Sequence, residues 1–359
     1  MGKLALGAGA LVLVLLSYLL FWPVPIAPEA WDAPPNPGYE GDFAANSRLS
    51  ELELIDLPSG EYGPEDVAQG PDGRLFMAVH SGKILALDLA TRSFETFADT
   101  GGRPLGVEFD GAGTLWVADA YRGLLTVSPG GEVAVIASET SDGSPILYAD
   151  DLDIAADGKV YFSDASTRFS AAGIGDTLEA SILDLMEHSA NGRVLVYDPE
   201  SGAVDTLVDG LTFANGIALS ADETRLIIAE TGTYRIHAFD LEAASLQPFA
   251  GPLPGFPDNV NDNPDGTYWA GLVSPRNDAI DGLSGAPFLR KVVMRLPSAF
   301  SPAPTRYGFI MRLDARGRVL ETLQDPDGVF ASTTGAITLP DGHIIVSSLT
   351  DPRIGILAP

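Results

Sequence analysis

The chain has 359 residues, of which 45% are hydrophobic, 49 are acidic and 21 are basic, so its formal net charge is −28. A surface this acidic repels phosphate backbones and therefore argues against a nucleic-acid partner. The absence of cysteine excludes a disulfide framework, a thiol nucleophile and a metal held by thiolates.

The N-terminal segment is apolar and uncharged from Leu4 to Trp22. As a helix, about 19 residues measure ~28 Å, which is close to the hydrocarbon thickness of a bilayer. Lys3 precedes the segment and should stay in the cytoplasm. Residues 1–22 are therefore predicted to be an uncleaved, single-pass transmembrane signal anchor, with the remaining chain on the extracytoplasmic (periplasmic or luminal) side. A cleaved signal peptide is the alternative, although its apolar region normally has only ~7–15 residues.

Residues 23–46 form a segment rich in Pro, Ala and Asn. This composition predicts an extended linker that holds the following domain away from the membrane. The globular domain is expected to occupy residues 47–359.

A polar turn followed by a short apolar run occurs six times in this domain. The copies begin at Pro71, Gly111, Asp157, Asp222, Pro264 and Pro340. A second apolar strand follows each copy, so each repeat fits a unit of about four strands. The sequence therefore predicts an all-β fold, a six-bladed β-propeller. We expect residues Leu49 to Leu57 to supply the outer strand of the last blade, because such closure removes exposed strand edges.

Two long insertions interrupt the repeats, over residues 166–191 and 274–303. A short helix is expected in each of them, near Ile182–Met186 and near Phe288–Met294. Long insertions in a propeller tend to lie on one face of the ring, and the apolar residues in these two fit either a lid over a pocket or packing on a bilayer near the anchor.

The segment before each innermost strand is polar and differs from blade to blade. Four of these segments carry oxygen donors, namely Glu65, Asp150, Asn215, Asp258 and Asn259. Each of these residues alone would also fit an ordinary exposed turn. Because innermost strands start near the axis, we expect the five side chains to converge there. Hard cations such as Ca²⁺ take six to eight oxygen ligands, so the convergence predicts a metal site.

Several motifs resemble the strictosidine synthase-like family, which is related to the gluconolactonase/senescence-marker-protein and paraoxonase six-bladed propellers. They are Arg103–Val107, Tyr161–Ser166, Phe213–Gly216, Ala229–Thr231 and Pro254–Asn259. The resemblance implies an axial divalent metal, usually calcium, with Glu65, Asn215 and Asp258 as ligands and Asn259 as a further one. Asp150 falls where many relatives carry Asn, and a third carboxylate should bind the cation more tightly while weakening its pull on a substrate.

The resemblance also implies a calcium-dependent hydrolase of small-molecule lactones or of carboxylic or aryl esters. The metal would polarise the carbonyl and activate water, and Asp258 or Asp150 would take the proton. A different divalent cation would satisfy the same oxygen ligands. The alternative is a non-catalytic propeller that binds a ligand or a protein and holds a structural metal. Residues 332–337 lack the Glu that strictosidine synthase uses, so that synthase activity is not expected.

Overall fold

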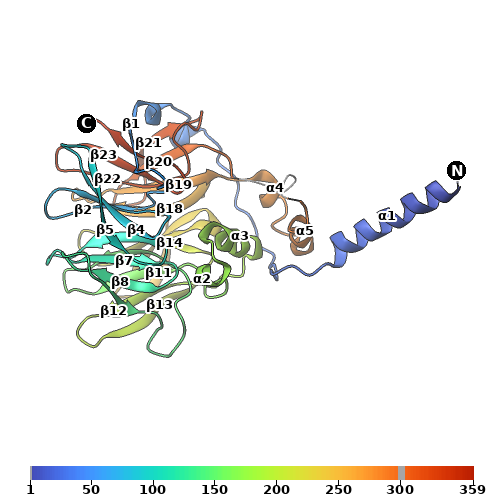
Figure 1. Ribbon diagram of the computed structural model, residues 1–359, viewed down its shortest axis with the longest axis horizontal. Helices are drawn as coiled ribbons and strands as arrows, with labels where there is room; N and C mark the ends of the chain where they lie inside the picture. The colour runs from blue at the N-terminus through green and yellow to red at the C-terminus, as the bar shows by residue number, and fades with distance from the viewer. Residues whose placement is uncertain (1, 298–303) are drawn as a thin grey trace.

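Six four-stranded antiparallel sheets form a ring in the computed structural model, which describes residues 2–297 and 304–359 (Figure 1). The innermost strands of successive sheets contact one another in the order β2, β6, β10, β14, β18, β22 and back to β2. The first three blades consist of β2 (Val67–Gln69), β3 (Leu75–Ala78), β4 (Lys83–Asp88), β5 (Ser93–Asp99), β6 (Pro104–Phe109), β7 (Leu115–Asp119), β8 (Gly123–Val127), β9 (Val133–Ala137), β10 (Ala149–Ile154), β11 (Val160–Asp164), β12 (Gly192–Asp198) and β13 (Ala203–Leu211). The next two consist of β14 (Ala214–Leu219), β15 (Arg225–Glu230), β16 (Arg235–Asp240), β17 (Ser245–Ala250), β18 (Gly255–Asp262), β19 (Tyr268–Pro275), β20 (Gly308–Leu313) and β21 (Val319–Asp325). The predicted six-bladed propeller is confirmed.

The sixth blade joins the two ends of the domain. It consists of β22 (Thr333–Thr338), β23 (Ile344–Ser348), β24 (Arg353–Leu357) and β1 (Glu53–Asp56). β1 pairs antiparallel with β24, with Glu53 opposite Ile356. The predicted closing strand is thus present, although it is shorter than residues 49–57, because Leu49 lies in a short 3-10 helix over Arg48–Glu51.

The repeated polar turns are hairpins that join each innermost strand to the next strand of its blade. In the first copy, Asp72 accepts a hydrogen bond from the backbone N–H of Arg74 at 3.0 Å, and Gly73 has φ +84°. The aspartate side chain stabilises the turn, and the glycine supplies the left-handed conformation that the turn requires. The repeat is therefore a local feature that the sequence encodes directly.

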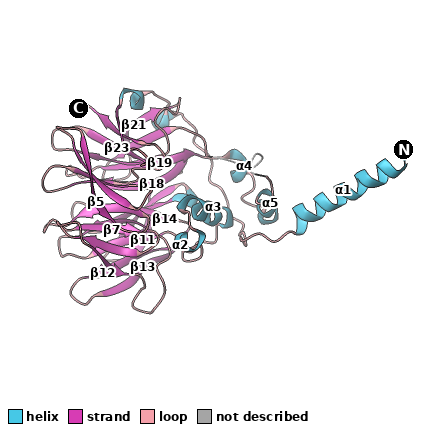
Figure 2. Cartoon of the chain, in the orientation of Figure 1, coloured by secondary structure: helices cyan, strands magenta, loops and turns pink. Residues whose placement is uncertain are grey.

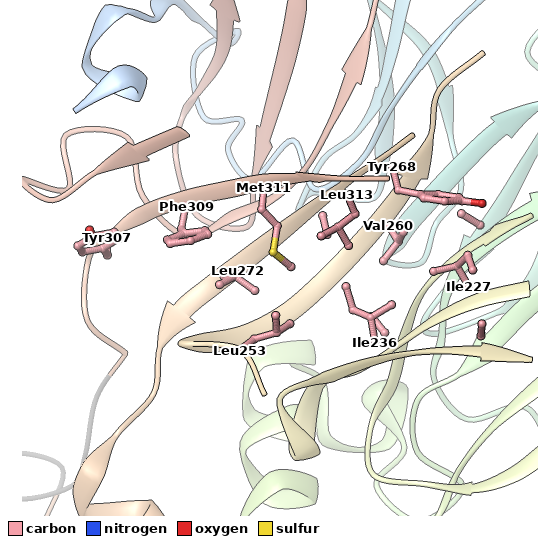
Figure 3. Packing of buried hydrophobic residues seen from close by; sticks show 14 residues of the cluster. Ile227, Ile236, Leu253, Val260, Tyr268, Leu272, Tyr307, Phe309, Met311 and Leu313 are labelled. Carbon is pink, nitrogen blue, oxygen red and sulfur yellow. The ribbon is translucent and has the colours of Figure 1, made fainter. Parts of the chain in front are cut away.

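Neighbouring blades pack face to face through alternate apolar side chains. Figure 3 shows Ile227 and Ile236 of the fourth blade meeting Val260, Leu272 and Met311 of the fifth, all of them buried. Burying each such side chain contributes roughly 1.5–3 kcal/mol. Because each sheet buries its faces only against its neighbours, the ring is stable when all six blades are present.

Both insertions contain the predicted helices and lie on one side of the ring (Figure 2). The helices are α2 (Ala171–Ile174), α3 (Thr177–Glu187), α4 (Asp278–Asp281) and α5 (Pro287–Val293). α3 begins where Asp176 accepts a hydrogen bond from the N–H of Glu179 at 2.7 Å, and it ends at His188, which has φ +56°. The last residues of the second insertion, 298–303, lie outside the described residues.

The chain begins with helix α1 (Gly2–Phe21), which extends away from the propeller beyond α5 (Figure 1). Among its described side chains, Leu11 to Leu16 and Phe21 are exposed. No helix within the described residues meets the length and hydropathy of a membrane span. The transmembrane anchor over residues 1–22 therefore stays a prediction.

The segment 23–46 differs from the free spacer that its composition predicted, because it lies against the propeller. Ile26 is buried at 3% exposure, and the ring of Tyr39 stacks on that of Tyr307 with centroids 4.8 Å apart. Asn46 donates a hydrogen bond to the carbonyl of Thr322 at 3.1 Å, close to the 3-10 helix over Gly41–Phe43. The prolines keep the segment extended, while its few large apolar residues bury themselves on the domain.

Candidate functional site

The five predicted oxygen donors lie where the innermost strands begin and where strand pairing is irregular. The register shifts between Ala149 and Leu152, between Ala214 and Ile217, and between Pro257 and Val260. Asp150, Asn215, Asp258 and Asn259 fall within these three irregular segments, and Glu65 lies two residues before β2. Residues in a bulge leave the ladder and their side chains are redirected, which aims these donors out of the sheets.

Close approach between β14 and β18 brings Asn215 next to Asp258. A Cβ atom at Gly216 would lie only 2.4 Å from the carbonyl oxygen of Asp258 and from the nitrogen of Val260, so the position requires glycine. The Nδ2 of Asn215 donates to the Oδ1 of Asp258 at 2.7 Å. The Asn215–Gly216 pair, which by sequence alone also fitted a turn, is thus part of a strand at a blade contact.

Three buried oxygens of this cluster have no hydrogen-bond partner among the described residues. The amide nitrogen of Asn259 donates to the carbonyl oxygen and to the Oε1 of Glu65, at 3.2 and 3.3 Å. The amide nitrogens of Asn215 and Asn259 donate to Asp258 and Glu65, and their Oδ1 atoms have no partner. The Oε2 of Glu65 also has no partner. Buried polar atoms are almost always satisfied, so these three oxygens together are available to bind a cation or an ordered water.

The electrostatics of the cluster lead to the same conclusion. Burial raises the pKa of Glu65 well above its usual range, and the charges of Asp258, Asp150 and Asp66 raise it further. Burial, then the charge of Asp258, raises the pKa of Asp150 in the same way. Burial raises the pKa of Asp258 to about 7, against the hydrogen bond from Asn215, which lowers it. Without a cation, these carboxyl groups therefore tend to hold protons near neutral pH.

Arg103 is a buried cation that partly offsets this negative charge. It is 1% exposed, its Nη1 donates to the carbonyl of Pro104 at 2.9 Å, and its other two guanidinium nitrogens have no partner among the described residues. Its charge opposes the rise in the pKa of Glu65 and Asp150. Three ionised carboxylates and Arg103 would leave a net charge of about −2, which a divalent cation would neutralise.

The donor set fits a hard cation in its chemistry, since every donor is an oxygen and two are neutral amides. In the part of the chain that the structure describes, no three or more His, Cys, Asp and Glu side chains alone form a group that could hold a metal ion, so a cation here would also depend on the amide oxygens. The unpartnered oxygens of Glu65, Asn215 and Asn259 are the observation that favours a cation here.

A second layer of carboxylates, which the sequence analysis did not single out, ties the blades together. Asp66 accepts a hydrogen bond from the N–H of Val107 at 2.9 Å, and Asp151 accepts one from the N–H of Ile217 at 2.8 Å. Both bonds cross from one blade to the next and satisfy amides that the irregular strand starts leave free. In the pair Asp150–Asp151, the first carboxylate thus belongs to the cluster and the second is structural.

The cluster forms the floor of a cavity of about 250 Å³. Glu65, Asp150, Asn215 and Asp258 line it, whereas Asn259 is fully buried beneath it and contacts Glu65. The insertions supply much of the wall, in agreement with the lid rather than the bilayer interpretation, through Leu178, Ile182, Leu185, Met186, Ile280, Val293 and Met294. The site thus joins a polar floor on the propeller axis to apolar walls.

Two aromatic residues in the wall were missed by the sequence analysis. His188, at the end of α3, and Trp31, in the N-terminal segment, both line the cavity, and their rings stack with centroids 4.0 Å apart at 17°. Burial, then the charge of Arg290, lowers the pKa of His188 to about 4, so its ring is neutral at pH 7. The sequence signal for Trp31 was its position among prolines, because a solvent-exposed linker does not require a large aromatic side chain.

Comparison with known proteins agrees with the motifs. Residues 150–243 match the family model for strictosidine synthase, and residues 41–87 match that for the strictosidine synthase-like N-terminal region. Adipocyte plasma membrane-associated protein of Salmo salar is 33% identical, over 96% of this chain and 87% of its own length. Protein strictosidine synthase-like 10 of Arabidopsis thaliana is 31% identical, over 90% of this chain and 91% of its own.

Solved structures with the same fold have much lower sequence identity. A gluconolactonase from Xanthomonas campestris has a TM-score of 0.63 and 17% identity, covering 92% of this chain and 97% of that one. A luciferin-regenerating enzyme has a TM-score of 0.56 and 11% identity, covering 86% and 95%. At such low identity, the comparison shows a shared propeller fold and nothing about activity.

Proposed function

The chain belongs to the strictosidine synthase-like family, and from this premise we propose that it is a divalent-cation-dependent hydrolase of lactones or of carboxylic or aryl esters. The observation that supports the proposal is the set of unpartnered, buried oxygens of Glu65, Asn215 and Asn259 next to a cavity with apolar walls. The gluconolactonase with the same fold adds an analogy at the level of fold.

Each residue has a defined part in this proposal. Glu65, Asn215, Asp258 and Asn259, with Asp150, would hold calcium or a similar cation. Such a cation supplies Lewis acidity to the carbonyl of a bound ester or lactone. Asp258, at the cavity floor, would take a proton from the attacking water, and Asp150 is the other candidate base. The water oxygen bonds to the carbonyl carbon, the acyl–oxygen bond breaks, and the proton passes to the leaving alkoxide.

The walls would restrict access of bulk water, which strengthens the electrostatic interactions at the floor. None of the described residues that line the cavity is Lys or Arg, so the binding surface favours a neutral acyl group. The same observation also suits the second candidate, a propeller that binds a neutral ligand and holds a structural cation without turnover.

Melting curves with and without EDTA, followed by assays on a lactone and aryl-ester panel, test the proposal. We expect calcium to raise the Tm of EDTA-treated protein, because a cation that binds only the native state stabilises it. We also expect the calcium-loaded protein to hydrolyse at least one class of substrate. A rise in Tm without turnover would favour the binding propeller, and no change in Tm would remove the metal from the proposal.

We further propose that α1 anchors the protein to a membrane as a single pass, with the propeller on the extracytoplasmic side. The exposed apolar residues of α1 support this, as do the relatives named for their association with the plasma membrane. In cell fractionation, the full chain should stay in the membrane pellet after a carbonate wash, whereas a chain without residues 2–21 should not. Release of the full chain by carbonate would contradict the anchor.

A further inference from the structure

The N-terminal segment crosses the lid and reaches the mouth of the cavity. The backbone N–H of Ala27 donates to the carboxylate of Glu187 at 2.6 Å, and the N–H of Glu29 donates to the carbonyl of the same residue at 2.9 Å. Arg290 of α5 donates to the carbonyl of Glu29 and, at 3.0 Å, to that of Met186. The segment is thus bonded to both α3 and α5.

Further along, the same segment is tied to the start of the second insertion. Arg276 donates to the carbonyls of Pro34 and Pro35, at 2.6 and 3.3 Å, and its guanidinium lies 4.1 Å from the centre of the Tyr234 ring. Arg276 also forms an ion pair with Asp281 of α4 at 2.8 Å. The path of residues 26–36 across the cavity mouth is therefore fixed at both ends.

Between these attachments, Trp31 faces the cavity. Its ring stacks on His188 and lies 5.9 Å from the ring of Tyr234, and all three residues line the cavity. Ile26 packs in one cluster with Leu105, Tyr148 and Phe213, which also line it. The segment contributes an aromatic side chain to the cavity beside the wall formed by α3 and α5.

We propose that residues 26–36 form one wall of the binding site and that Trp31, stacked on His188, is a specificity-determining residue for substrates with a neutral, extended apolar acyl group. The substrate class rests on the proposed hydrolase function, whereas the role of the wall in ligand binding does not. An indole face contributes apolar contact area at low entropic cost. It should therefore increase the affinity for longer acyl chains and add little affinity for an acetyl group.

Kinetics with p-nitrophenyl esters test the substrate class, using full-length protein in detergent micelles. For Trp31→Ala, we expect kcat/KM to fall about tenfold with the octanoate, mainly through KM, and to change little with the acetate. Trp31→Phe should retain most of the preference for octanoate. Trp22→Ala is the matched control, because Trp22 is 60% exposed and does not line the cavity. An unchanged chain-length profile in Trp31→Ala, with normal melting, would overturn the proposal.

Quenching of tryptophan fluorescence by 8-bromo-1-octanol tests the wall without hydrolysis. In a Trp22→Phe background, which removes the exposed indole, we expect saturable quenching that the additional Trp31→Phe substitution abolishes. Saturable quenching in a protein that cleaves no ester and no lactone would support the wall and reject the hydrolase function. Ester cleavage together with quenching that Trp31→Phe leaves unchanged would reject the wall and keep the hydrolase.

Discussion

Replacing Asp258 by alanine is expected to lower kcat/KM for the best lactone or ester by at least ~10²-fold and to weaken the stabilisation by calcium. Asp258 is 5% exposed at the cavity floor, accepts the hydrogen bond of Asn215, and its charge raises the pKa of both Glu65 and Asp150. Its loss therefore removes a proposed metal ligand, a candidate base and the partner that accepts the hydrogen bond of the Asn215 amide. Initial rates and the calcium-induced shift in Tm measure the two effects.

Asp262→Ala is the matched control, because Asp262 lies on the same strand, β18, is exposed, and does not line the cavity. It should retain both hydrolysis and the response to calcium. If Asp258→Ala kept both properties as well, the proposed metal-dependent hydrolase would be wrong. Loss of the calcium response with hydrolysis intact would assign the cation a structural role.

Stability should depend on pH in opposite directions with and without calcium. In EDTA, the free energy of unfolding is expected to fall as the pH rises from about 5 to 8. The native pKa of Glu65, Asp150 and Asp258 lies above the unfolded value, so over this range the native state binds more protons than the unfolded chain. Each such group contributes a slope of up to about −1.4 kcal/mol per pH unit. The stabilisation is present below pH ~4 and is lost as the pH passes about 7, the native pKa of Asp258.

Millimolar calcium should reverse this slope, because the cation binds the ionised carboxylates and competes with the protons. Urea unfolding midpoints between pH 5 and 8, in EDTA and in calcium, provide the measurement. The net charge of −28 also makes the protein less stable at higher pH, because its acidic groups repel one another. Asp258→Asn removes one titrating carboxyl of the cluster and leaves this general repulsion nearly unchanged, so it serves as the control that isolates the contribution of the cluster. Identical pH profiles in EDTA and in calcium would argue against a cation at this site.

The sequence revealed the ring because the ring is built from local signals. The turn that ends in Asp72-Gly73 and its later copies are stabilised within a few residues, and the apolar alternation that follows encodes each strand. The repeat therefore predicted the six blades, and the incomplete last copy predicted that β1 would pair with β24. The helices near Ile182–Met186 and Phe288–Met294 were found for the same reason, since each apolar run is a local feature.

The donors of the site were also identified from the repeat, because they occupy equivalent places in successive blades. What the sequence could not separate was the role of adjacent residues such as Asp150 and Asp151. One of them lines the cavity and the other accepts the N–H of Ile217 in the next blade. The difference depends on an irregular strand start, and bulges leave little trace in a single sequence.

The sequence by itself thus determined the six-bladed architecture, its closure, the two insertions with their helices and the oxygen donors that precede the innermost strands. Only the tertiary structure decided that Trp31 lines the cavity, that it stacks on His188, and that Arg103 lies buried near the carboxylates. The physical reason is the distance along the chain between the residues that interact. Turns and strands depend on neighbours a few residues away, whereas the wall and the charge balance join side chains more than a hundred residues apart or from separate blades, and their contacts exist only once the ring has closed.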